Sequence, residues 1–341
     1  MHSKNTVATP LRGSCLVVGG CGFLGYHIVR HLLQDDQTGV VHVLDRQIEQ
    51  NRHEKAAYTC GNITDSALLY SLVAEIRPSV IFHVASPLAS LLAKREGEFF
   101  ETNVRGTQAL LTVAVESEFV QALVYTSSVD TYANPPHDYV NESHVLWAST
   151  DKSNEYNRTK AIAGVLVRQA NGPQLRTVCL RLGHAYGERH VQGMVEVLDM
   201  CAGNKKLVQV GPGNNLMEVL SADNCATAHV LAAKALLEPS RAAGRVDGEA
   251  FNISDGKPMP FWHHIKLIWK TAREWLFWVF TLNMVKPPVQ LRRVSLGHCL
   301  YTHTYSIEKA RETLLFNPVS DHDAVLEQSA RWMLRHRESM K

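Results

Sequence analysis

The chain has 341 residues, of which 45% are apolar and 20% are charged, a composition that is typical of a folded globular protein and excludes extended disorder. Its 35 basic and 33 acidic residues are well mixed and give a formal net charge of +2, so no basic stripe indicates a nucleic-acid-binding protein. We therefore expect a small-molecule ligand and no nucleic acid partner.

The seven cysteines are odd in number, widely spread and free of any C-x-x-C pair, which argues against a disulfide framework and against a zinc site. The histidines, among them the adjacent His263 and His264, show no metal-ligand spacing along the chain, so surface or packing roles are the simpler interpretation. We expect a reducing compartment and no metal site.

Residues 1–12 are polar and lack the apolar core of a signal peptide, so we expect a flexible tail on a protein that is not secreted and that stays on the cytosolic side. The most apolar run, residues 275–285, is too short to cross a bilayer, which needs about 20 residues, but it is able to lie on one.

A glycine-rich turn, GGCGFLG, follows a short apolar strand predicted over residues 15–18 and precedes a helix that starts near Phe23. Gly19, Gly22 and Gly25 have the spacing of a dinucleotide-binding turn. Tight turning, close backbone approach to a pyrophosphate and close packing of helix on strand each require glycine, and the helix N-terminus attracts the phosphate. Strand, turn and helix in this order indicate a dinucleotide-binding unit.

The next predicted strand ends at Asp45, 20 residues after Gly25. A carboxylate there binds the adenosine ribose hydroxyls and repels a 2′-phosphate, so NAD is favoured over NADP. Arg46 follows directly, and because a guanidinium binds phosphate well, NADP remains the less favoured alternative.

Strands and helices continue to alternate, with strand patterns over residues 79–86 and 121–128 and helix patterns over residues 103–116 and 157–170. This alternation predicts an α/β fold of the Rossmann type, a doubly wound parallel sheet with helices on both faces. Ligands of such sheets bind beyond the carboxyl ends of the strands. The groups expected along that edge are the glycine turn, Asp45, Ala85, Ser86, Ser127 and Ser128.

Tyr156 and Lys160 are four residues apart at the start of the last of these helices, Tyr156 directly before the pattern over residues 157–170, so they share one face and reach a common space. A free phenol has a pKa of about 10, and a fixed positive charge nearby favours the phenolate, which is then able to exchange a proton. An isolated Tyr-x-x-x-Lys is more often a surface helix with a half-buried ring and a solvated lysine, so the surrounding motifs decide.

The motifs GGCGFLG, HVAS, NVRGT, VYTSSVDTYA and YNRTK, in this order and spacing, resemble those of the extended short-chain dehydrogenase/reductase family. The resemblance implies that Tyr156 is the general base, that Lys160 lowers its pKa and binds the nicotinamide ribose, and that a serine hydrogen-bonds the reacting oxygen. Alignment favours Ser128 over Ser127, although hydroxyls that only cap a strand end are the common alternative for such a pair. The resemblance also implies an NAD site formed by Gly19, Gly22, Phe23, Leu24, Gly25, Asp45, Asn62, Ile63, Ala85 and Ser86, with Tyr156 and Lys160.

The second half narrows this resemblance to the 3β-hydroxysteroid dehydrogenase branch, through LRLGHAYGERH, GNNLMEVLSADNCATAHVLAAKAL and GEAFNISDGKPMPFWHHIKLIW. Within that branch the chain resembles the decarboxylating sterol 4α-carboxylate 3-dehydrogenases, from about Gly13 to about Trp332. It implies an NAD-binding domain over residues 13–182 and a smaller C-terminal substrate-binding lobe over most of residues 183–341, with some segments returning to the first domain.

The activity implied is NAD(P)-dependent oxidation of a 3β-hydroxyl on a sterol or triterpenoid, with loss of a C4 carboxylate as carbon dioxide. Arg181, Arg189, His184 and His190 are candidates to hold that carboxylate, with surface or structural roles as an equal alternative. Six aromatic residues support a lipid-like substrate, with core packing as the alternative for about half of them: Trp262, Trp269, Trp275, Phe277, Trp278 and Phe280.

Three positions depart from the family pattern, since Leu182 replaces a usual proline, Asn62 a usual aspartate and Ala133 a usual glycine. They indicate a specialised member that acts on an altered polycyclic substrate. Two rival functions stay open on the same fold, a nucleotide-sugar epimerase or dehydratase and a non-catalytic NAD-binding regulator. The resemblance further implies peripheral contact with the endoplasmic reticulum membrane and a homodimer.

Overall fold

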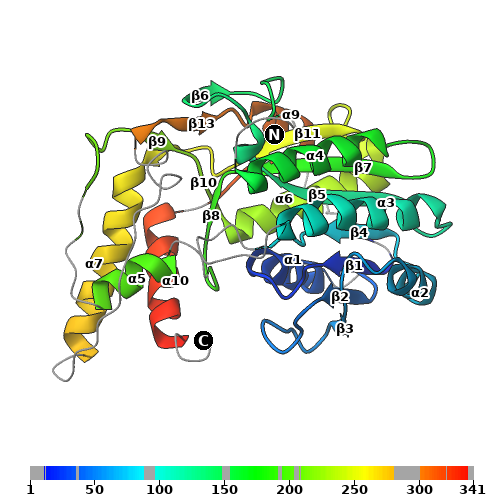
Figure 1. Cartoon of the computed structure of the whole chain (residues 1–341), viewed down its shortest axis with the longest axis horizontal. Helices are drawn as coiled ribbons and strands as arrows, with labels where there is room; N and C mark the ends of the chain where they lie inside the picture. The colour runs from blue at the N-terminus through cyan, green and yellow to red at the C-terminus, as the bar shows by residue number, and fades with distance from the viewer. Residues whose placement is uncertain are drawn as a thin grey trace, which may run out of the picture.

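The computed structural model describes residues 11–336 with gaps at 12, 36–37, 88–96, 148–153, 191–193, 203–206, 208, 280–299 and 320 (Figure 1). Of residues 274–279 it describes the backbone alone. The predicted tail, apart from Leu11, and the apolar run beyond Val279 therefore lie outside the described residues.

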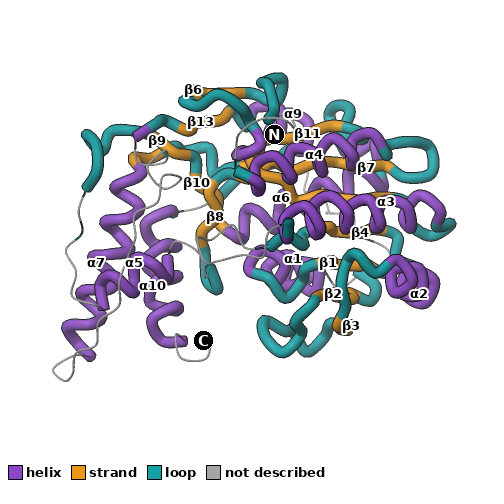
Figure 2. Tube along the Cα trace, viewed as in Figure 1, coloured by secondary structure: helices purple, strands orange, loops and turns teal. Residues whose placement is uncertain are grey.

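A seven-stranded sheet forms the centre of the larger part, with strand order β3-β2-β1-β4-β5-β7-β11 (Figure 2). Every pairing between neighbours in it is parallel. The predicted doubly wound α/β fold is confirmed. Its strands are β1 (Cys15–Val18), β2 (Val41–Asp45), β3 (Ala57–Cys60), β4 (Val80–His83), β5 (Ala122–Ser128), β7 (Arg176–Leu182) and β11 (Glu249–Ile253).

Helices cover both faces of this sheet because successive side chains of a strand point to opposite faces. Val17 belongs to the core beneath α1 and α6, whereas Leu16 belongs to the core beneath α2, α3 and α4. Both residues are fully buried. The five helices are α1 (Phe23–Gln34) and α6 (Ala222–Leu237) on one face, and α2 (Ser66–Ile76), α3 (Thr107–Glu116) and α4 (Glu155–Gln169) on the other.

The helix predicted over residues 103–116 is divided in the structure into a π-helix, η1 (Phe100–Gly106), and α3. Within η1, Asn103 Nδ2 donates a hydrogen bond to Thr159 Oγ1 of α4 at 3.0 Å. Such wide turns are frequent at functional sites. Here the wide turn carries Asn103 to the helix that bears Tyr156 and Lys160.

The smaller lobe stands at one end of the sheet, where three helices pack around an apolar core that includes Tyr186, Val219, Ile268 and Leu326 (Figure 1). Two small sheets, β8-β10 and β12-β9-β13-β6, connect it to the larger part. Its helices are α5 (Met194–Ala202), α7 (Phe261–Val279) and α10 (His322–His336), and its strands are β6 (His137–Val140), β8 (His184–Tyr186), β9 (Leu216–Met217), β10 (Val219–Ser221), β12 (Met259–Pro260) and β13 (His303–Tyr305).

Three short elements complete the description: η2 (Val129–Thr131), η3 (Pro239–Arg241) and α9 (Glu308–Leu314). No helix within the described residues combines the length and the apolar character that crossing a bilayer requires.

Candidate active site

The glycine turn between β1 and α1 lies too close to neighbouring backbone to accept side chains. Gly19 has a φ of +89°, and a Cβ on it would lie 2.6 Å from the Ala85 amide nitrogen at the end of β4. A Cβ on Gly25 would lie 2.1 Å from the Gly19 carbonyl oxygen. Gly22 caps α1 without a side-chain hydrogen bond, so the first amides of the helix are open to an anion. This cradle fits a pyrophosphate.

Asp45 ends β2 beside that turn. One carboxylate oxygen accepts a hydrogen bond from the Cys21 amide at 3.0 Å, and the other accepts one from the Gln47 amide at 3.3 Å. Burial raises the pKa of Asp45, and the backbone hydrogen bonds partly offset that effect. The exposed Arg46 guanidinium lies 3.5 Å from the Glu98 carboxylate.

The other predicted cofactor residues lie at the same edge of the sheet. Asn62 is exposed and accepts a hydrogen bond from the Thr64 amide at 3.2 Å, while Ile63 is buried. The Ala85 amide donates to the Val18 carbonyl at 2.9 Å, and the Ser86 hydroxyl donates to the Pro87 carbonyl at 3.2 Å. In the first turn of α1, Phe23 stacks on His190 and Leu24 is half-buried.

Ser128 and Tyr156 meet at the end of β5. Burial raises the pKa of the Tyr156 phenol, the Asp130 carboxylate raises it further, and a hydrogen bond with the Ser128 side chain lowers it. Ser128 Oγ also accepts a hydrogen bond from the Asp130 amide at 3.1 Å. The Phe99 ring, 5.6 Å from the Tyr156 ring between centroids, packs against the phenol.

Ser127 points elsewhere, because neighbouring residues of a strand face opposite sides. It packs beneath α4, where a Cβ on Gly164 would lie 3.4 Å from Cys179 Sγ and 3.8 Å from Ser127 Oγ. The structure thus brings Ser128, and not Ser127, to Tyr156.

Lys160 is 3% exposed, and its ammonium donates a hydrogen bond to the Thr126 carbonyl at 2.8 Å. Burial lowers the pKa of Lys160 to about 8. We expected this lysine to lower the pKa of Tyr156; burial and Asp130 raise that pKa in the structure, and the effect of Lys160 stays a prediction. The Lys160 ammonium is directed at the β5 backbone.

The candidate carboxylate-binding residues Arg181, His184 and His190 differ in burial. Arg181 is buried and donates to the Tyr132 hydroxyl at 2.9 Å and to the Glu142 carbonyl at 3.1 Å, so its role is structural. His190 is also buried, whereas His184 is exposed and its ring lies 6.1 Å from that of His190.

Arg189 joins the two parts of the molecule, a role that the sequence did not suggest. Its guanidinium lies over the Tyr26 ring of α1 at 3.9 Å and over the Trp332 ring of α10 at 4.8 Å. It also donates to Asn51 Oδ1 at 2.7 Å, and Asn51 in turn donates to the Cys21 carbonyl of the glycine turn at 2.9 Å. The glycine turn is therefore tied to the smaller lobe.

Residues 16–274 match the 3-beta hydroxysteroid dehydrogenase/isomerase family, and they include the glycine turn, Asp45, Ser128, Tyr156 and Lys160. The chain belongs to this family. The predicted membership, and with it the predicted class of enzyme, an oxidoreductase of the 3β-hydroxysteroid dehydrogenase type, is confirmed.

Several relatives in this family carry the name decarboxylating sterol-4-alpha-carboxylate 3-dehydrogenase. The protein from Gibberella zeae is 31% identical over 286 residues, which cover 76% of this chain and 92% of the relative. The protein from Schizosaccharomyces pombe is 27% identical over 345 residues, covering 94% and 97%, and that from Bos taurus is 27% identical over 346 residues, covering 94% and 93%.

Solved structures with the same fold come from more distant proteins. UDP-glucose 4-epimerase from Thermotoga maritima, solved with UDP-glucose, superposes with a TM-score of 0.73 at 19% identity and covers 96% of this chain and all of that one. A dTDP-glucose 4,6-dehydratase from Bacillus anthracis, solved with NAD, gives 0.71 at 20% identity and covers 96% and 98%. At such identities the likeness concerns the fold alone.

Proposed function

We propose that this protein oxidises the 3β-hydroxyl of a sterol or triterpenoid with a nicotinamide cofactor, and that a carboxylate on C4 is then lost as carbon dioxide. The observation that carries the proposal is the contact of Tyr156 with Ser128 at the cofactor edge, in a chain whose relatives are named sterol-4-alpha-carboxylate 3-dehydrogenases.

The edge of the sheet supports a nicotinamide dinucleotide. The glycine turn and the open N-terminus of α1 would hold the pyrophosphate, and Asp45 would hold the adenosine ribose. Bound there, an oxidised nicotinamide supplies the hydride acceptor and a positive charge beside the phenol. We propose NAD over NADP because the Asp45 carboxylate repels a 2′-phosphate and Arg46 lies beside Glu98.

Tyr156 is proposed to accept the proton of the substrate hydroxyl. Ser128 would hold the substrate oxygen by a hydrogen bond, and the phenolate of Tyr156 would accept the proton as the C3–H bond breaks and the C3 oxygen becomes a carbonyl. A buried phenol with a raised pKa needs a cation beside it to ionise. Lys160 supplies that charge if its ammonium leaves the Thr126 carbonyl for the ribose and phenol.

Loss of carbon dioxide follows from the product of this oxidation. A ketone at C3 beside a carboxylate at C4 is a β-keto acid, in which the bond from C4 to the carboxylate carbon breaks and its electron pair moves into the enolate of the ketone. The enolate then takes up a proton. No further residue is required for this step, so the proposal does not depend on Arg181, whose hydrogen bonds are structural.

The smaller lobe is proposed to bind the lipid-like substrate. Two aromatic residues of α7 pack within the lobe: Trp262 is buried and donates to the Val210 carbonyl at 2.9 Å, and Trp269 packs against the apolar core. The side chains of Trp275, Phe277 and Trp278, and all of Phe280, lie outside the described residues. We further propose that residues 13–182 form the cofactor domain. We also propose that the protein attaches peripherally to the cytosolic face of the endoplasmic reticulum and forms a homodimer.

The rival functions have less support. The epimerase and the dehydratase are similar to this chain in fold alone, at 19% and 20% identity, whereas the sterol enzymes match by sequence over most of the chain. A non-catalytic regulator would not need Tyr156 and Ser128 in contact.

An NADH fluorescence assay with three substrates tests the proposal. We expect NADH with a 4α-carboxy-3β-hydroxysterol, slower or no formation with the 4-methyl alcohol, and none with a UDP-sugar. Equal rates on both sterols would show that the enzyme does not recognise the carboxylate. Turnover of the UDP-sugar alone would overturn the proposed substrate class.

A further inference from the structure

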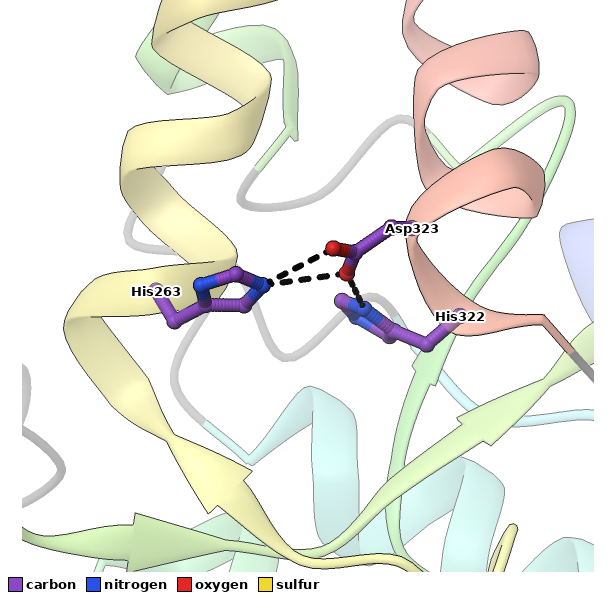
Figure 3. A group of neighbouring side chains, drawn as sticks. All are labelled: His263, His322 and Asp323. Carbon is purple, nitrogen blue, oxygen red and sulfur yellow. Dashed lines mark hydrogen bonds and ion pairs between the residues drawn. The ribbon is translucent and has the colours of Figure 1, made fainter.

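Two helices of the smaller lobe bring together a group of side chains outside the proposed active site. His263 lies in the first turn of α7, and His322 and Asp323 lie in the first turn of α10 (Figure 3). His263 Nε2 is 3.0 Å and 3.2 Å from the two oxygens of Asp323, and His322 Nδ1 is 2.7 Å from one of them. One ligand atom from each residue lies within 4.8 Å of the others.

We propose that His263, His322 and Asp323 form a site for a divalent transition-metal ion of the zinc class. Two imidazoles and a carboxylate are ligands that zinc prefers, with Zn–N and Zn–O distances of about 2.0–2.2 Å. Two ligands of a tetrahedral ion are roughly 3.4 Å apart at those distances. The separations between the histidine nitrogens and the Asp323 oxygens, 2.7–3.2 Å, are close to this value, and all three ligand atoms lie within 4.8 Å of one another, so side-chain movements would admit the ion.

His264, next to the proposed ligands, orients the His322 ring. His264 Nδ1 lies 3.0 Å from His322 Nε2, and the His322 ring packs 4.9 Å from the buried Tyr186 ring. A metal on His322 Nδ1 requires the proton of that ring to be on Nε2, from which it would donate to His264 Nδ1. Such an outer hydrogen bond fixes the tautomer and orientation of a ligating imidazole.

The surroundings leave room for water to complete the coordination. The side chains of His263 and Asp323 are 48% and 52% exposed, so the ion would have three protein ligands and at least one water molecule. Because the ligands come from the first turns of two packed helices, the ion would link α7 to α10. The site would therefore affect the stability of the lobe rather than the chemistry at Tyr156.

The test uses the full chain without a polyhistidine tag, stripped with EDTA and titrated with Zn²⁺ by calorimetry and with Co²⁺ by visible absorption. We expect one equivalent of metal, a tetrahedral Co²⁺ spectrum, and at least tenfold weaker binding in His263→Ala and in Asp323→Asn. Matched controls on α10 and just before it, His336→Ala and Asp321→Asn, should bind as the unmodified chain does. The same variants are compared for thermal unfolding without metal, to verify that they fold.

Absence of saturable binding would overturn the proposal, and so would affinity unchanged in both His263→Ala and Asp323→Asn. Among the described cysteines Cys60 has the exposed thiol and is a competing ligand, so Cys60→Ser is included. If that variant alone abolishes binding, the metal binds elsewhere and the site is wrong.

Discussion

Two groups of titratable side chains differ in burial. One is the catalytic edge, with Tyr156 and Lys160, and the other is the α7–α10 group, which consists of His263, His322 and Asp323. Lys160 is 3% exposed and burial lowers its pKa to about 8, and burial also raises the pKa of Tyr156. His263 and Asp323, by contrast, are about half exposed, although the third member of that group, His322, is 11% exposed. Burial makes each protonation state depend on a few neighbours, which gives chemical control at a cost in folding stability. Exposed titratable groups reduce folding stability little, and they remain accessible to ions in solution.

The largest effect is expected from Tyr156→Phe, which removes the proposed base and keeps the ring beside Phe99. The turnover number should fall by about 10³-fold, within the usual range for loss of an acid or base. Steady-state NADH formation measures it, with NADH binding by fluorescence as the control. A variant that retains a tenth of the activity would remove Tyr156 from the proton transfer.

The two serines provide a matched pair at the end of β5. Ser128→Ala should lower the turnover number by about 10²-fold, because it removes a hydrogen bond to the developing charge on oxygen. Ser127→Ala should stay within threefold, since that residue packs beside Cys179 and Gly164. Equal losses in the two variants, measured under the same conditions, would show that the strand end matters only as structure.

Lys160→Met should lose activity and gain stability. A pKa lowered from 10.5 to about 8 means that the unfolded chain binds more protons between these values, so the wild-type protein becomes more stable as pH rises through that window. Below pH 8 the full penalty is present, on the order of 3 kcal/mol, and methionine removes it. Urea unfolding at pH 7 and pH 10 measures the difference. A variant that is less stable at pH 7 would make the bond to Thr126 the main role of this lysine.

Glu218, between β9 and β10, is buried like Lys160 but lies outside the proposed chemistry. Burial raises its pKa from 4.5 to about 7, its carboxylate accepts a hydrogen bond from Ser254 Oγ at 2.8 Å, and Asp255 raises the pKa further. The folded state therefore favours the protonated acid, and stability present below pH 4.5 is lost as pH rises through 7. Glu218→Gln should be more stable than wild type at pH 8 by up to about 3 kcal/mol, and equal to it at pH 4. Equal unfolding midpoints at pH 8 would contradict the effect.

The smallest effect is expected at the exposed group. Without metal, His263→Ala should change the free energy of unfolding by less than about 1 kcal/mol, because an exposed pair such as His263–Asp323 contributes little. Urea unfolding in EDTA measures this. A loss comparable to the changes at Lys160 or Glu218 would mean that exposure does not separate the two regions.

The fold and the cofactor edge were predictable because their signals are local. The strand over Cys15–Val18 and the helix start at Phe23 follow from a few adjacent residues, and the structure has both. Tyr156 and Lys160 share α4. Ser128 ends β5, a strand that the alternation of strand and helix patterns along the chain predicts.

What could not be predicted depends on contacts between distant segments and on burial. Lys160 contacts the Thr126 carbonyl, a backbone group without a sequence signal, and the pKa of Tyr156 is raised by burial and by Asp130, which spacing along the chain does not reveal. Arg189 contacts Asn51, 138 positions away, and His263 contacts Asp323, 60 positions away. Spacing along the chain does not reveal such pairs, and the proposed metal site depends on the contact between His263 and Asp323.

The most direct measurement uses a 4α-carboxy-3β-hydroxysterol that carries deuterium on C3, with NADH analysed by mass spectrometry and carbon dioxide collected in parallel. The account predicts one deuterium in each NADH and one carbon dioxide for each NADH formed. NADH without deuterium, or carbon dioxide released without NADH, would contradict oxidation at C3 as the step that this site performs.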